Sequence, residues 1–501
     1  MQPSFYVQPS FSRRRLALAA SLTLCASIAT AATATATAPA AAAAPRITAA
    51  EFRHDIAFVR AMIARMHPDP AFSTDPAAMH RALDRVAQAL PDTLTRDQAW
   101  RRLATVNALL ADGHFFIGYP DWREEARAWL AGGGSVFPAE VEVAPDGALY
   151  LRPDPDPGLG TGGSEGEGGR ARIVAVNGVD AAELVAALSP LVHGDTPRFR
   201  AHLLGQRWWL YYWKAFGAPA HYELELERGQ ERGQERDRGQ ERDRAREGAR
   251  RTVAMPGRRT LPAILDEEAR APFDLAIGED GRAVLTLGTF SLADPAPFLA
   301  FTRAAFACLG ARGATTLVID ISRNGGGDDA LWLDGLMPYI ATRPYRTGST
   351  YRGLSRARAG EAAQPMRGEI ATWRQPQPHN PLRFAGNTEV RIGPGTYSSA
   401  VLFANVMRDF QFATLVGEGG AARRSQSGGV REVRLPYSGL ALVLPRFILD
   451  PPAGASPGAL LEAAQGPPTP GARRAAGAAS SPAPAPRPRP ESGRPKCAGP
   501  G

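Results

Sequence analysis

Two adjacent serines stand where a predicted strand gives way to a predicted helix. Ser398 and Ser399 follow an apolar strand over residues 390–392 and precede a helix that ends near Asp409. A serine at such a junction lies at the positive end of the helix dipole, which stabilises an alkoxide and the tetrahedral oxyanion that follows it. Helix capping is the routine alternative for serine at this place. The pair therefore predicts a nucleophile, a cap, or one of each.

A run of three glycines follows a second apolar strand. The strand covers residues 316–321, and Gly325, Gly326 and Gly327 come a few positions later. Glycine lets the backbone turn with positive φ and lets another group approach closely. Exposed amides at such a strand end can hold an anion or an oxyanion. A plain tight turn is the alternative for the same residues.

A histidine follows the predicted helix that starts at the capping box of Thr95 and Gln98. It is His114, in the sequence Asp-Gly-His, and Gly113 is the residue predicted to break the helix. The ordinary pKa of histidine suits proton transfer near neutral pH. A histidine satisfied at the surface or in the core is the alternative. His114 is therefore a candidate general base.

Together, these segments resemble the carboxyl-terminal-processing (tail-specific) serine peptidases, and in particular their tricorn-like serine–histidine branch. The resemblance runs from about residue 48 to residue 450 and keeps the order of the family's motifs. It is carried by residues 110–114, 173–178, 318–327, 396–400 and 416–418. The fold that it implies is multidomain α/β (α+β), with an N-terminal helical cap, a PDZ-like β-rich module and an α/β catalytic core of the tail-specific protease (ClpP/crotonase-like) type.

The resemblance also implies roles for single residues. Ser398 matches the nucleophile, and Ser399 would offer its backbone N–H to the oxyanion together with Gly325 or Gly326. The substrate would be a polypeptide bound in extended form, often near its C-terminus, and water would resolve an acyl-enzyme. Such chemistry needs no metal ion and no organic cofactor.

The family uses either a lysine or a histidine as the base. The lysine would fall near Arg423, and arginine stays protonated at any working pH, so it cannot be a general base. The only lysines are Lys214, in an aromatic run, and Lys496, near the end of the chain. Of the eight histidines, only His114 matches a catalytic motif. The resemblance places the acid that orients the histidine late in the catalytic domain, where Glu462 is a poor match, so the sequence does not assign it.

The N-terminus has the composition of an export signal. Residues 13–15 are arginines, residues 16–32 are apolar, and residues 29–31 offer a small-residue cleavage site. Residues 12–16 also resemble a twin-arginine signal. No other stretch reaches the roughly 18 apolar residues that a membrane span needs. The mature protein is therefore expected in the periplasm or secreted, without a stable membrane span.

Composition and periodicity divide the chain into five regions. We expect a signal peptide and Ala-rich linker at 1–45, a helical domain at 46–125, a PDZ-like module at 126–262, an α/β catalytic domain at 263–452 and a disordered Pro/Ala/Arg-rich tail at 453–501. Low-complexity insertions interrupt the module at 158–169 and 227–251, and strands at 222–226 and 252–255 are expected to pair across the second one. The net charge of +8 does not gather in a basic stripe with aromatics, so a nucleic-acid partner is not expected.

Other functions fit parts of this sequence. A non-catalytic peptide- or ligand-binding protein could use the same scaffold, because a fold alone does not prove chemistry. An esterase would use the same acyl chemistry, and a structural envelope protein would need neither motif. The presence of both Ser398 and His114 favours an enzyme, and the PDZ-like segment favours peptides over small esters. The absence of Gly-x-Ser-x-Gly around Ser398 argues against an ordinary α/β-hydrolase.

Overall fold

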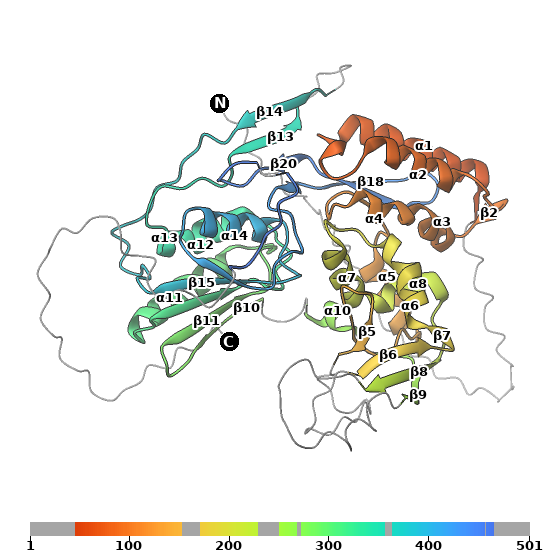
Figure 1. Ribbon diagram of the computed structural model, residues 1–501, viewed down its shortest axis with the longest axis horizontal. Coiled ribbons are helices and arrows are strands. Elements are labelled where there is room, and N and C mark those ends of the chain that lie inside the picture. Colours follow the sequence, from red (N-terminus) through yellow and green to blue (C-terminus); the bar gives the residue numbers. More distant parts are fainter. Residues whose placement is uncertain are drawn as a thin grey trace, which may run out of the picture. The chain divides into compact units, whose positions relative to one another are not determined.

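The computed structural model describes residues 46–152, 171–228, 250–267, 272–355, 363–455 and 457–464 (Figure 1). The expected signal peptide, the insertion at 158–169, most of the insertion at 227–251 and most of the tail lie outside these residues. Within the described part of the chain, no helix is both long and apolar enough to cross a membrane.

The N-terminal region is helical, as expected. Its elements are β1 (Ile47–Thr48), α1 (Ala49–Met66), α2 (Pro76–Ala87), β2 (Thr93–Leu94), α3 (Arg96–Leu103), α4 (Asn107–Leu110), β3 (Phe116–Gly118) and α5 (Trp122–Ala131). Both predicted capping boxes form, at Thr48 with Glu51 and at Thr95 with Gln98. Helix α1 lies beside α2 (Figure 1) and buries one face, and each fully buried apolar side chain there contributes about 1.5–3 kcal/mol of transfer free energy.

The middle region contains an antiparallel sheet covered by helices. Its strands are β4 (Val141–Val143), β5 (Leu149–Leu151), β6 (Ala171–Val176), β7 (Val179–Asp180), β8 (His221–Arg228) and β9 (Arg250–Pro256), and its helices are α6 (Ala181–Leu188), α7 (Pro197–Gln206) and α8 (Trp208–Phe216). The strand order is β4-β5-β6-β8-β9. Strands β8 and β9 pair in antiparallel register from His221 with Pro256 to Glu227 with Arg250, which confirms the pairing expected across the second insertion.

The core is a five-stranded sheet with crossover helices. Its strands are β10 (Phe273–Ile277), β11 (Arg282–Leu287), β12 (Thr316–Asp320), β15 (Asn387–Ile392) and β16 (Thr414–Gly417), and its helices are α11 (Ala296–Ala311), α12 (Asp329–Gly335), α13 (Met337–Ile340) and α14 (Ser399–Asp409); a short α10 (Ala263–Glu267) precedes them. Strands β11, β12, β15 and β16 are parallel, so their carboxyl ends share one edge of the sheet. Helices α12 and α14 lie side by side (Figure 1), and their N-termini follow the two strand ends that carry the glycine run and the serine pair.

Two smaller sheets connect distant parts of the chain. One has the order β14 (Pro365–Glu369), β13 (Thr350–Leu354), β20 (Phe447–Leu449) and β17 (Gln426–Gly428), and the other has β18 (Arg431–Arg434), β19 (Ala441–Leu444) and β3. Strand β3 pairs with β19 through Phe116 with Val443 and Ile117 with Leu442. The segment that follows α4 in the N-terminal region is therefore paired with a strand near residue 442.

The packed chain continues past the boundary at 452 that composition indicated. Leu461 is buried, and its N–H donates to the Ala422 carbonyl at 2.9 Å. The N–H of Ala464 donates to the Leu415 carbonyl, also at 2.9 Å. Residues 457–464 thus pack against β16 and the segment that follows it.

Candidate active site

Ser398 has a strained backbone at the start of helix α14. Its φ of 54° and ψ of −125° form a conformation that residues with a Cβ rarely adopt. Such strain is kept where the surrounding structure requires it, and a nucleophile on a sharp strand-to-helix turn is a known instance. The side chain is half-buried, and its hydroxyl makes no hydrogen bond with any described residue. Ser398 therefore has the geometry and the free oxygen of a nucleophile.

Ser399 has a different environment, although it is the next residue. It is 2% exposed, and its hydroxyl donates to the carboxylate of Asp329 while accepting from Trp332 Nε1 at 3.0 Å. Burial raises the pKa of Asp329 to about 6, and the hydrogen bonds from Ser399 and Trp332 oppose that rise. The Ser399 hydroxyl is thus used to join α14 to α12. Its backbone N–H has no acceptor in the described part of the chain.

The glycine run lies directly against the two serines. A Cβ on Gly326 would lie 2.7 Å from Ser398 Cβ and 2.9 Å from the Ser399 nitrogen, and its φ is +99°. The Gly326 N–H already donates to Asn324 Oδ1 at 2.8 Å. The N–H of Gly325, by contrast, has no acceptor among the residues described. Of the two glycines expected at an oxyanion site, Gly325 therefore has the available amide, and Gly326 provides the close approach.

A pair of glycine substitutions tests this division. We expect Gly326→Ala to lower kcat by about 10²-fold or more, because the new Cβ would displace Ser398 and positive φ disfavours alanine. Gly325→Ala is the matched control, since nothing lies within 4 Å of its added Cβ and the N–H is kept. Steady-state measurement of kcat for both variants tests this expectation. Equal kcat for the two variants would contradict the assignment.

His114 lies beside Tyr397, the residue that precedes Ser398. Its backbone N–H donates to Asp112 Oδ1 at 2.7 Å, and its ring packs against the ring of Tyr397 with centroids 5.0 Å apart. Nδ1 lies 3.1 Å from Ser427 Oγ. Nε2 makes no hydrogen bond with a described residue, Ser398 included. Catalytic hydrogen bonds often form only when substrate is bound, so the free Nε2 is compatible with a base.

A buried hydrogen-bond network joins four segments that are far apart in the sequence. The Tyr397 hydroxyl donates to Asp195 Oδ1 at 2.5 Å and accepts from the Gly113 N–H at 2.9 Å. The Arg423 N–H donates to Asp195 Oδ2 at 2.9 Å, and its guanidinium donates to the Ala111 carbonyl at 2.6 Å. Arg423, at the position where the resemblance implied a lysine, therefore holds the backbone that leads to the histidine.

Burial sets the protonation of the groups around His114. Desolvation lowers the pKa of His114 to about 4, and the charge of Asp195 opposes this shift. Burial raises the pKa of Asp112, against the hydrogen bonds from the His114 amide and the Ser427 hydroxyl and the charge of Arg423. Near neutral pH the imidazole is therefore neutral and able to accept a proton.

The remaining candidates from the sequence lie elsewhere. Glu462 is exposed beside Gly419 and Gly420 and makes no hydrogen bond to His114. Lys214 is buried, where it pairs with Glu125. Neither residue contacts Ser398 in the structure.

Four polar residues of the site were not found from the sequence: Asp195, Tyr397, Gln426 and Ser427. Gln426 Oε1 accepts from the Ser398 N–H at 3.1 Å, and its Nε2 donates to the Arg423 carbonyl at 2.7 Å. Only Tyr397 had a usable signal, because it adjoins the candidate nucleophile Ser398. The others come from strands and loops without a motif.

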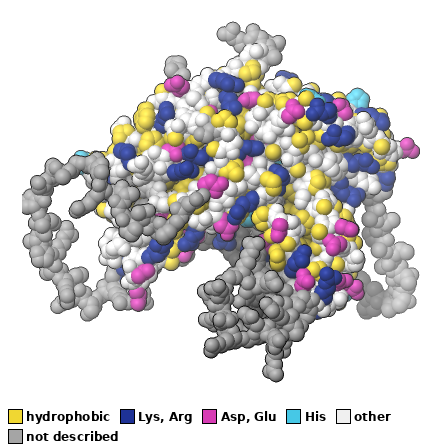
Figure 2. All heavy atoms as spheres, viewed as in Figure 1, with side chains coloured by type: hydrophobic (Ala, Val, Ile, Leu, Met, Phe, Trp, Pro, Cys, Tyr) yellow, Lys and Arg dark blue, Asp and Glu magenta, His cyan; other side chains and the backbone are white. Residues whose placement is uncertain are grey.

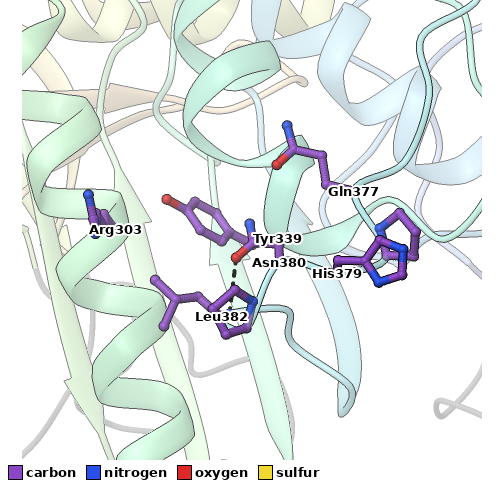
Figure 3. A pocket seen from close by; sticks show the side chains of 8 residues that line it. Arg303, Tyr339, Gln377, His379, Asn380 and Leu382 are labelled. Carbon is purple, nitrogen blue, oxygen red and sulfur yellow. Dashed lines mark hydrogen bonds between the residues drawn. The ribbon is translucent and has the colours of Figure 1, made fainter.

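One open cavity is unrelated to these residues. It has a volume of about 520 Å³ and lies between α11, α13 and the loop over residues 377–382. Figure 3 shows Tyr339, Asn380 and Leu382 facing it. Neither Ser398 nor His114 lines it, so it is not part of the candidate active site.

A strained serine at a helix N-terminus, amides without an acceptor in the described structure and a neutral histidine are the groups that serine hydrolases use. Residues 283–454 match the model of peptidase family S41. The chain is thus a serine peptidase whose core is an S41 domain.

The fold also matches solved structures. Mature CPAF matches with a TM-score of 0.53 at 15% identity, over 83% of this chain and 92% of that one. A serine-to-alanine mutant of CPAF gives a TM-score of 0.57 at 14% identity over the same shares. These likenesses show the fold. No curated protein sequence matches the chain.

Proposed function

We propose that Ser398 is the nucleophile of this peptidase and His114 its general base. The observation that carries the proposal is the contrast between the two serines: Ser398 is strained, half-buried and has a free hydroxyl, whereas the Ser399 hydroxyl is bound to Asp329 and Trp332. Two backbone N–H groups of the adjoining segments, those of Ser399 and Gly325, have no acceptor in the described structure.

The mechanism follows from this arrangement. Ser398 Oγ attacks the carbonyl carbon of the substrate while its proton passes to His114 Nε2, and the carbonyl electron pair moves to oxygen. The resulting oxyanion accepts from the N–H groups of Ser399 and Gly325, each worth about 10²–10³-fold in rate. When the C–N bond breaks, His114 donates its proton to the leaving amine. Water then attacks the acyl-enzyme by the same steps and restores Ser398.

The substrate class is the finer part of the proposal. We infer that the enzyme hydrolyses extended polypeptides, near their C-termini, and that the region 126–262 acts as a PDZ-like module that presents them. Support comes from the antiparallel sheet with α6 beside it and from the order of motifs along the chain. On the face shown in Figure 2, basic and acidic side chains are interspersed, which does not favour a polyanionic partner.

We also propose that the protein is exported and works in the periplasm or outside the cell. The composition of residues 1–45 supports this proposal. Mass spectrometry of the protein recovered from the periplasm and the medium should find a new N-terminus soon after residue 31. A full-length chain that stays in the cytoplasm would contradict it.

The test uses the mature protein, a fluorophosphonate probe and four substrates. We expect labelling at Ser398, cleavage of an unfolded polypeptide, and faster cleavage of a peptide with a free C-terminal carboxylate than of its amide. Labelling with hydrolysis of a p-nitrophenyl ester, but of no peptide, would make the protein an esterase. Absence of labelling and hydrolysis, with peptide binding kept, would make it a binding protein.

A further inference from the structure

A chain of two hydrogen bonds links the candidate base to a buried carboxylate. His114 Nδ1 lies 3.1 Å from Ser427 Oγ, and the Ser427 hydroxyl donates to Asp112 Oδ1 at 2.7 Å. Asp112 is 0% exposed and Ser427 is 3% exposed, so water does not compete for these bonds. Ser427 lies on β17, which reaches the site from the sheet formed with β20 and β13.

With Asp112 as a carboxylate, the direction of the Ser427–Asp112 bond sets which ring nitrogen of His114 carries the proton. A serine hydroxyl has one proton, and that of Ser427 goes to Asp112. Ser427 Oγ can therefore only accept from His114, so the proton of the neutral ring is on Nδ1. Nε2 is left with its lone pair, and it is the nitrogen that must take the proton of Ser398.

Asp112 holds the histidine twice. Its carboxylate accepts a hydrogen bond from the backbone N–H of His114. It also accepts one from the Ser427 hydroxyl, which in turn contacts the His114 ring. The other charged groups facing this place are Asp195 and Arg423, and Arg423 lies 3.7 Å from Asp195 Oδ1 rather than in contact with the relay. A positive imidazolium, formed when Ser398 loses its proton, would be stabilised by the Asp112 carboxylate through the serine hydroxyl.

We propose that Ser427 and Asp112 are positioning residues that orient His114 and stabilise its charged form. The proposal rests on the proposed roles of Ser398 and His114. It supplies the orienting acid that the sequence did not assign, from a residue two positions before the base. Glu462, the late-domain candidate, makes no such contact.

The chain offers a matched control two residues away. Ser425 is also buried, at 6% exposure, and its hydroxyl donates to Asp450 Oδ1 at 2.7 Å. Ser425→Ala removes the same kind of serine–carboxylate bond without touching His114. It should therefore lower stability by a similar amount and leave kcat unchanged.

The decisive experiment compares Ser427→Ala, Asp112→Asn, the double variant and Ser425→Ala in the mature protein. We expect Ser427→Ala and Asp112→Asn each to lower kcat by about 10²-fold with little change in KM, and the double variant to lose little more. Proton NMR should show a low-field Nδ1–H signal in the wild type and Ser425→Ala that is absent in Ser427→Ala. Wild-type kcat in Ser427→Ala, or losses that multiply in the double variant, would overturn the relay.

Two further variants separate the possible failures. If Ser427→Ala does not fold, Ser427→Thr keeps the hydroxyl and should recover kcat, whereas Asp112→Asn keeps one acceptor oxygen and removes the charge. If Ser398→Ala retains hydrolysis, the proposed nucleophile is wrong. If Ser398→Ala is inactive while Ser427→Ala and Asp112→Asn keep wild-type kcat, only the relay is wrong.

Discussion

Replacing Ser398 with alanine should lower kcat for peptide hydrolysis by about 10⁴–10⁶-fold, the loss typical of a missing serine nucleophile. The hydroxyl of the adjacent Ser399 cannot replace it, because that hydroxyl is buried and donates to Asp329. Labelling by a fluorophosphonate should disappear as well. Circular dichroism should show an unchanged fold, since the Ser398 hydroxyl has no partner among the described residues.

Ser399→Ala is the matched control for this prediction. It keeps the backbone N–H that would contact the oxyanion but leaves Asp329 without its hydroxyl donor. We expect a free energy of unfolding lower by about 1–3 kcal/mol, with labelling at Ser398 retained. Labelling lost in Ser399→Ala and kept in Ser398→Ala would exchange the roles of the two serines.

Replacing His114 with alanine should lower kcat by about 10⁴-fold or more. The pH dependence of the wild-type enzyme is a second test of His114 as the base. The base works as neutral imidazole, and burial lowers the pKa of His114 to about 4. Activity should therefore persist well below the usual histidine pKa of about 6.5 and fall as the pH drops through about 4. An acid limb of kcat/KM near pH 6.5 would contradict this environment for His114.

Stability must be followed in the same titration. His67 is buried and His202 is half-buried, and each has a pKa lowered to about 4, mainly by desolvation. A histidine with a lowered folded pKa stabilises the fold above its unfolded pKa, and that stability is lost as the pH falls from about 6.5 towards the folded value. Melting temperatures should thus decrease below pH 6.5 while kcat/KM, measured on folded protein, holds until about pH 4.

The sequence predicted those features that depend on interactions between residues close together in the chain. The capping boxes at Thr48 and Thr95, the helix at 399–409 and the strands of the parallel sheet follow from propensity, capping and apolar pattern. Motifs that match a known family gave Ser398, His114 and the glycine run. These motifs are continuous in sequence, so one chain suffices to find them.

The details of the histidine segment were not predictable in this way. Gly113 was expected to end the helix, but Ala111 takes the left-handed conformation, with φ of 48°. The reason is tertiary: a Cβ on Gly113 would lie 2.5 Å from the ring of Tyr397, so this glycine permits close packing and does not end the helix. The contact of Ser427 was not predictable either, because its partner Asp112 is 315 positions away in the sequence.

The pairing of β3 with β19 has a consequence for how the enzyme is made. His114 leaves the ribosome early. Strand β19, which pairs with the segment after His114, and Ser427, which contacts its ring, are both synthesised more than 300 positions later. Contacts of such sequence separation form slowly and only once both partners exist. On the proposed roles, a growing chain has neither an oriented base nor a nucleophile beside it, so proteolysis begins only after synthesis of the whole domain.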